Sequence, residues 1–184
     1  AAGILVTTNG STAIGNNKGL FAWRVSTSAD FSTTVRANDG TGSGWGGANH
    51  PDWNQLDFRA ASETATTKAR LSRNPTPIEP GQYTVILEPQ AAGDLVSLLG
   101  NAFDARPADE GRSVFSKAGG GTRVGEKIVD ERVTFLSDPA DPQLLASPFD
   151  SDGLPVGRQL WVENGVLKTL GYSRYWAQRQ NRTP

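Results

Sequence analysis

The chain offers few residues that could perform acid–base chemistry, and its one histidine is the first of them. His50 lies in the run Asn49-His50-Pro51-Asp52-Trp53. A carboxylate can orient a histidine as a general base, so Asp52 could in principle act on His50 in this way. No serine nucleophile motif accompanies the pair, and the neighbouring proline and N-capping aspartate are typical of a loop. We therefore predict that His50 is an ordinary loop residue.

Two further segments have residue types that can bind ions. Asp150-Ser151-Asp152-Gly153 resembles the opening of a calcium loop, but the twelfth position is Trp161, where a bidentate glutamate would be needed. Successive amides in the glycine-rich run Lys117–Gly125 could bind an anion, yet the run lacks Gly-Lys-Ser/Thr and a helix pattern after it. We predict a turn for the first segment and a flexible connector for the second.

Paired acids and tryptophans complete the candidates. Asp130-Glu131, and Asp138 with Asp141, could divide acid and base roles, but their spacing in sequence says nothing about the distance between their carboxyl groups. We predict that they lie on solvated faces and in turns. Five tryptophans could form a sugar or peptide platform if they were exposed. We predict that most are in the core and that Trp45, which lies among glycines, is outside it.

The composition excludes several classes of site and partner. The 184 residues include no cysteine, which excludes disulfides, thiolate metal sites and a cysteine nucleophile, and a single histidine excludes a multi-histidine zinc site within the chain. The net charge of −1 gives no electrostatic basis for binding nucleic acid or a membrane surface. No apolar run approaches the roughly 20 residues of a membrane span. Methionine is absent even at position 1, so we expect the chain to be a piece of a longer protein.

Residues 1–73 predict a β meander followed by a helix. The runs Ile4–Asn9, Gly19–Thr27 and Asp30–Asn38 are rich in β-branched residues and are separated by turn residues. The run Gly40–Gly47 is glycine-rich and predicts a mobile loop. A capping box at Asp52 and Gln55 predicts the start of a helix that ends near Arg73. Its apolar face would comprise Leu56, Ala60, Thr64, Thr67 and Leu71.

Prolines at 75, 77 and 80 mark a domain boundary, and residues 74–184 predict a second α+β region. This region begins with a strand at Tyr83–Leu87 and a helix that starts at Pro89 and runs to about Phe103. A strand at Arg132–Ser137 and a type I′ hairpin around Asn164-Gly165 follow. The expected fold class is α+β, with antiparallel sheets and two main helices. A curled or barrel-like second sheet remains an alternative.

Six stretches in the second half follow one another in an order that resembles a known family. They are Pro80–Ala91, Gly111–Lys117, Arg132–Pro139, Ser147–Gly153, Leu160–Lys168 and Tyr175–Pro184. In that order they resemble motifs of the TldD/PmbA family, whose members are known as modulators of DNA gyrase and as peptide-maturation metalloproteases. The resemblance implies that residues 1–73 are part of the family's middle domain and residues 74–184 the first part of its C-terminal domain. These motifs are structural rather than catalytic.

The resemblance also implies which branch of the family the chain belongs to. In the TldD branch, a His-Glu-x-x-x-His run and a later cysteine hold a metal beside a glutamate that activates water. Here Ser97, Leu98 and Ala102 stand in place of that run. The chain is therefore similar to the TldE/PmbA branch, with no catalytic or metal-binding residue of its own. Zinc is expected only in a TldD-like partner.

The function implied is that of the non-metal subunit of a cytoplasmic metalloprotease complex that degrades or matures unfolded peptides. A peptidase whose site residues lie outside this sequence is one alternative. A non-proteolytic adaptor that regulates DNA gyrase is another, and a piece that is inert alone is a third. We expect an oligomer with no direct contact to nucleic acid or membrane, because unpaired sheet edges favour association.

Overall fold

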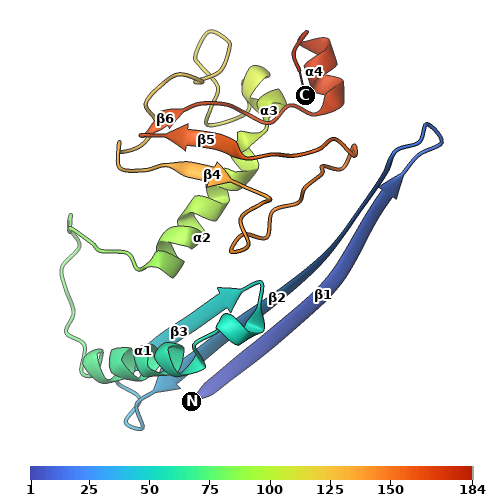
Figure 1. Ribbon diagram of the computed structural model, residues 1–184. Helices are drawn as coiled ribbons and strands as arrows, with labels where there is room; N and C mark the ends of the chain where they lie inside the picture. Colours follow the sequence, from blue (N-terminus) through green and yellow to red (C-terminus); the bar gives the residue numbers. More distant parts are fainter. Residues whose placement is uncertain (184) are drawn as a thin grey trace. The chain divides into compact units, whose positions relative to one another are not determined.

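Three antiparallel strands form the first sheet of the computed structural model, which describes residues 1–183 (Figure 1). The strands are β1 (Ala2–Gly15), β2 (Phe21–Arg36) and β3 (Ser43–His50), in the order β1-β2-β3. The predicted meander is confirmed in kind. Its second and third predicted runs are one strand, β2, because the residues between them, Ser28 and Ala29, pair with β1 without a break. Pro184, which ends the last family-like stretch, lies outside the described residues.

The predicted mobile loop at Gly40–Gly47 is wrong, because most of it belongs to β3. The reason is the packing of helix α1 (Phe58–Leu71) against this strand. A Cβ atom built on each of three alternate glycines would lie 2.1–2.2 Å from a helix carbonyl oxygen. These glycines are Gly42, Gly44 and Gly46, and the carbonyls belong to Ala69, Ala65 and Ala61. The glycines are thus required for close backbone approach, not for flexibility.

The same packing corrects the predicted face and start of the helix. Its buried residues are Ala61, Ala65 and Ala69, whereas Leu71 is 75% exposed. Small alanines face the glycines because a larger side chain would separate helix and strand. The N-cap of α1 is Asp57, and Asp52 instead caps the short 3-10 helix η1 (Trp53–Gln55) by accepting a hydrogen bond from the Asn54 amide.

Asp39 connects the turn after β2 to the end of α1. Its carboxylate accepts hydrogen bonds from the backbone amide (3.1 Å) and hydroxyl (2.9 Å) of Thr41, and it forms an ion pair with the Arg73 guanidinium. The Thr41 amide, followed by Arg73, lowers the pKa of Asp39 to about 2. The turn therefore depends on the charged form of the carboxyl group.

Acidification is expected to remove the contribution of Asp39 to stability. Because the pKa in the folded state is lower than in the unfolded state, this contribution is present above pH 4 and is lost as the pH falls toward 2. Urea unfolding of the wild type and of Asp39→Asn, measured between pH 7 and pH 2, should show a stability difference that shrinks in this range. A difference that does not change with pH would contradict the assignment.

Residues between α1 and α2 form neither helix nor strand, which corrects the strand predicted at Tyr83–Leu87. This segment pairs with no strand in the described part of the chain, and Ile86 is 96% exposed. High β-propensity reflects how well side chains pack on a half-buried sheet surface, so it does not form a strand without a neighbouring strand.

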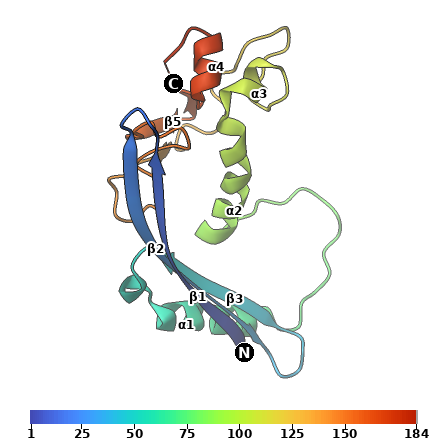
Figure 2. The same cartoon turned by 90° about the vertical axis from the view of Figure 1, so that its right-hand side faces the viewer.

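The second unit comprises 83–140 and the chain from Pro148 onward. It contains α2 (Pro89–Gly100), η2 (Asn101–Phe103), α3 (Ala105–Asp109) and α4 (Arg174–Arg179) (Figure 2). Its antiparallel sheet has the order β4-β5-β6, with β4 at Phe135–Ser137, β5 at Gln159–Glu163 and β6 at Val166–Leu167. The α+β class is confirmed. Over the described residues this sheet is open and forms no closed barrel. The strand predicted at Arg132–Ser137 is shorter than expected, because β4 starts only at Phe135.

Two local predictions in this unit are confirmed. The helix from Pro89 continues through η2 to Phe103, with proline in the first turn where its missing amide costs nothing. Asn164 and Gly165 have φ angles of 49° and 77° between β5 and β6. Positive φ at both central residues is the signature of a type I′ turn.

Aromatic residues dominate the core of the second unit. Phe103 lies with its ring centroid 5.2 Å from Phe115, 5.5 Å from Phe135 and 5.4 Å from Trp161. Leu167 is fully buried in the same cluster.

No helix in residues 1–183 is long and apolar enough to cross a membrane.

Candidate functional site

The helix α2 and the short helix η2 after it carry the three residues that the sequence resemblance aligns with the TldD metal motif. The Ser97 hydroxyl donates a 2.7 Å hydrogen bond to the Asp94 carbonyl, Leu98 is 72% exposed, and Ala102 packs on the core of the second unit. A hydroxyl bonded to the backbone and two hydrocarbon side chains supply neither an imidazole ligand nor a proton acceptor. Within residues 1–183 no three histidine, cysteine or carboxylate side chains gather in a way that could hold a metal ion.

His50 is the last residue of β3 rather than a loop residue, and Asp52 does not orient it through its carboxylate. The ring Nδ1 of His50 accepts a 2.9 Å hydrogen bond from the backbone amide of Asp52. The Asp52 carboxylate instead accepts hydrogen bonds from the amide (3.0 Å) and side chain (2.9 Å) of Asn54. These bonds, the backbone amide first, lower the pKa of Asp52. The pair shows the geometry of a strand end, not of a catalytic dyad.

The two ion-binding candidates are both hydrogen-bonded turns. Asp150 Oδ1 accepts hydrogen bonds from the amides of Asp152 (2.9 Å) and Leu154 (2.8 Å). In the glycine-rich segment, the Lys117 amide donates to the Gly121 carbonyl at 2.9 Å. The second segment is therefore a closed turn and not the loose connector that its composition predicts.

The paired acids form local contacts. Asp130 bonds to the guanidinium of Arg132, which is the main cause of its pKa falling to about 2. Glu131 pairs with Lys127 at 3.2 Å. Asp138 and Asp141 each accept a 2.9 Å hydrogen bond from an amide two residues later. These contacts are those of solvated turns.

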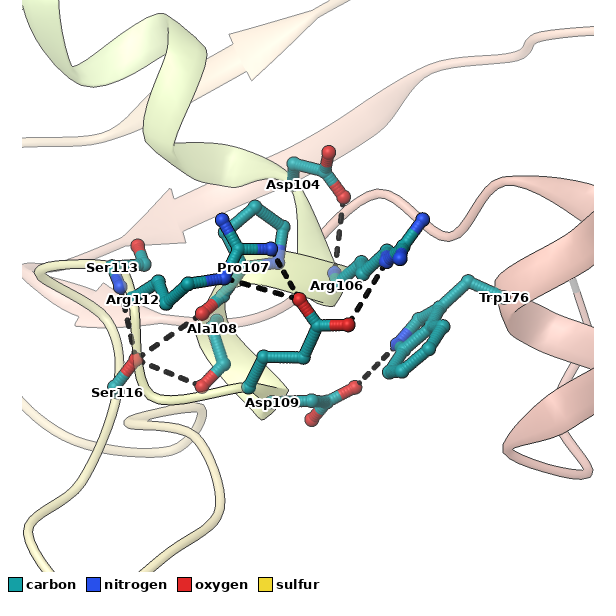
Figure 3. A network of polar contacts seen from close by, with 10 residues as sticks. Asp104, Arg106, Pro107, Ala108, Asp109, Arg112, Ser113, Ser116 and Trp176 are labelled. Carbon is teal, nitrogen blue, oxygen red and sulfur yellow. Dashed lines mark hydrogen bonds and ion pairs between the residues drawn. The ribbon is translucent and has the colours of Figure 1, made fainter.

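A polar network connects α3 and α4 (Figure 3). The Glu110 carboxylate bonds to both Arg106 and Arg112, and the two guanidinium groups lower its pKa. Asp109 Oδ2 accepts a 2.7 Å hydrogen bond from the indole nitrogen of Trp176, and the Arg106 guanidinium carbon lies 5.4 Å from the centroid of the same ring. Each charged side chain named here has a bonding partner within the network. The network therefore stabilises the contact between α3 and α4.

The tryptophans are more exposed than predicted. Trp176 is buried and Trp161 is half-buried, but Trp23 and Trp53 are exposed together with Trp45. The prediction that most lie in the core is therefore wrong, whereas the prediction for Trp45 is confirmed. Exposed and half-buried side chains alternate along the first half of β2, and Trp23 is one of the exposed ones. The local sequence alone does not reveal which face of the strand is exposed.

Trp53 borders a groove of about 590 Å³ that sequence reasoning missed. Its lining includes Thr7 and Asn9 of β1, Thr27 of β2, and Asp52 beside Trp53. A hydroxyl-rich wall, one ionised carboxylate and one aromatic face can bind a polar ligand. No spacing motif marks the groove, because its residues come from three separate stretches of the chain.

Comparison with known families identifies the chain. Residues 2–73 match the PmbA/TldA metallopeptidase central domain, and residues 80–184 match the PmbA/TldA metallopeptidase C-terminal domain. The chain belongs to the PmbA/TldA family. Its members among curated proteins include one named metalloprotease from Archaeoglobus fulgidus, 33% identical over 54% of this chain and 22% of the relative. Another metalloprotease, from Methanothermobacter thermautotrophicus, is 28% identical over 68% of this chain and 26% of the relative.

Solved PmbA/TldA structures share the fold. A crystal structure from Thermotoga maritima, described as a candidate modulator of a DNA gyrase, matches with a TM-score of 0.87 and 22% identity over 99% of this chain and 42% of that one. TldE from Thermococcus kodakarensis matches with a TM-score of 0.76 and 20% identity over 98% of this chain and 40% of that one. At these identities the likeness shows the fold alone. The chain spans less than half the length of each of these relatives.

Proposed function

We propose that this chain belongs to the non-metal, TldE-like subunit of a cytoplasmic metallopeptidase that cleaves unfolded peptides together with a TldD-like subunit. The observation that carries the proposal is the chemistry at Ser97, Leu98 and Ala102. None of the three can bind zinc through an imidazole or accept a proton from water. The names of the metalloprotease relatives and the fold shared with TldE also support this function.

In such a complex the zinc and the glutamate that activates water belong to the partner. This chain would complete the walls of the chamber and hold peptide in an extended conformation. Extended peptide is bound economically by a sheet edge, because backbone hydrogen bonds place few demands on side chains. The position of β1 at the edge of the first sheet supports this role.

We expect the complete gene product to cleave an unfolded model peptide only when it is mixed with a His-Glu-x-x-x-His paralogue from the same organism. The rate in the mixture should exceed the sum of the separate rates by at least about tenfold, since the catalytic step requires both subunits. A zinc chelator should abolish it. The readout is release of a fluorophore from a quenched casein-derived peptide.

Two outcomes would contradict the proposal. Cleavage by the gene product alone, without the paralogue, would indicate a peptidase with its own site. No cleavage in any combination would favour the non-proteolytic adaptor. A paralogue whose motif glutamate is replaced by glutamine is the matched control, because it keeps the zinc ligands and removes the base.

A further inference from the structure

The outer edge of β1 is an open row of backbone donors and acceptors. At the end of the hairpin, the Asn16 amide donates a 3.0 Å hydrogen bond to the Leu20 carbonyl. Bonded pairs alternate along an antiparallel ladder, so the even-numbered residues of β1 bond to β2. The odd-numbered residues, from Gly3 to Gly15, therefore direct their amides and carbonyls away from the sheet. Figure 1 shows β1 at the margin of this sheet.

The opposite edge of the same sheet is partly covered by side chains at and after the end of α1. On β3 the Ser72 hydroxyl donates to the Ser43 carbonyl at 2.8 Å and accepts from the Ser43 amide at 3.0 Å. The Lys68 ammonium donates to the Trp45 carbonyl at 2.9 Å. Lys68 of α1 and its C-cap residue Ser72 thus bond to outward groups of Ser43 and Trp45. Within residues 1–183 no such side-chain bond is found along the outer edge of β1.

β1 also lacks the usual features that prevent strand addition. Its 14 residues include no charged side chain and no proline, and nearly all are exposed. Natural proteins normally blunt an edge with lysine, proline, a bulge or a cover. A long, uncharged edge without any of these is a template for another extended chain.

The groove beside Trp53 adds a preference for one kind of side chain. Thr7 and Asn9 belong to the outward-directed residues of β1 and also line the groove, so edge and groove adjoin. The Asp52 carboxylate, whose pKa is lowered, stays ionised at neutral pH. Trp53 is 51% exposed and offers an apolar face. Together they favour a basic side chain with an aliphatic stem.

We propose that β1 is a docking edge for an extended polypeptide, which adds as a fourth strand and places a lysine or arginine in the groove. The inference deepens the proposed function and rests on it for the origin of the peptide. A second copy of this chain fits less well, because its own β1 has no basic residue to place beside Asp52.

The test is fluorescence anisotropy of labelled ten-residue peptides of alternating valine and threonine with one central lysine, added to the chain without its partner. Two isomers carry N-methyl groups on the odd or on the even positions. An added strand directs every second amide toward the sheet. Only the isomer whose N-methyl groups replace those amide hydrogens should bind more weakly, by about tenfold or more. Equal affinity of the two isomers would overturn strand addition.

The groove is tested with Asp52→Asn, which keeps an acceptor for Asn54 and removes the charge. It should reduce the preference for lysine over glutamate at the central position by about threefold or more, whereas the matched control Asp39→Asn, outside the groove, should not. An unchanged preference would overturn the groove assignment. Sedimentation of the chain with the labelled peptide is the second measurement. A dimer that forms through β1 and leaves the peptide unbound would overturn the proposal. Peptide binding is measured without the metal-bearing partner, whereas cleavage is measured with it. A failure of peptide binding to β1 would therefore be distinguishable from a failure of the proposed function.

Discussion

Replacing Gly44 with valine is expected to lower the free energy of unfolding of the first unit, which comprises 1–82 and 141–147, by about 3 kcal/mol or more. A Cβ atom at this position would lie 2.1 Å from the Ala65 carbonyl oxygen and 2.5 Å from the Ala69 amide nitrogen. Both are backbone atoms of α1, so the clash cannot be relieved by rotating a side chain. The helix would have to move away from β3 and expose the alanine face that it buries.

The matched control is Gly10→Val in β1, where a Cβ atom would have nothing within 4 Å. This substitution should be neutral or slightly stabilising, because valine favours strands and restricts the unfolded chain. Urea titrations followed by far-ultraviolet circular dichroism compare the two variants. Equal losses in both would show that Gly44 is not a packing requirement.

Shortening Leu167 to alanine is expected to destabilise the second unit by about 2 to 5 kcal/mol. Leu167 has 0% exposure and lies in the core cluster with Phe103, Phe115 and Trp176. The lost methyl groups leave a cavity that aromatic rings, held by their own packing, cannot fill by collapse. Tryptophan fluorescence during urea unfolding reports on this cluster through Trp161 and Trp176 when the three tryptophans outside the second unit are replaced by phenylalanine in both proteins.

The same substitution at Leu98 provides the control, since Leu98 is 72% exposed on α2. Leu98→Ala should change stability by less than about 0.5 kcal/mol, because little apolar surface is removed from a buried environment. A loss at Leu98 as large as that at Leu167 would mean that the exposed face of α2 is covered in solution. This pair of variants therefore also reports on the exposed face of α2.

Local patterns predicted best where a single backbone requirement decides the outcome. Asn164-Gly165 predicted the type I′ turn because few residues tolerate positive φ at both central positions. Pro89 predicted the start of α2 because its ring suits the first turn of a helix.

The sequence by itself determined the α+β class, the hairpin and the start of α2, because each depends on residue type or on neighbours in sequence. Only the tertiary structure decided that the glycine run is a strand, since its partner, the alanine face of α1, lies about 20 residues away. It likewise decided that Tyr83–Leu87 forms no strand, and that β1 has an open edge beside the groove at Asp52 and Trp53. These features depend on which distant segments of the chain come into contact. A local sequence pattern does not determine the free energy of such contacts.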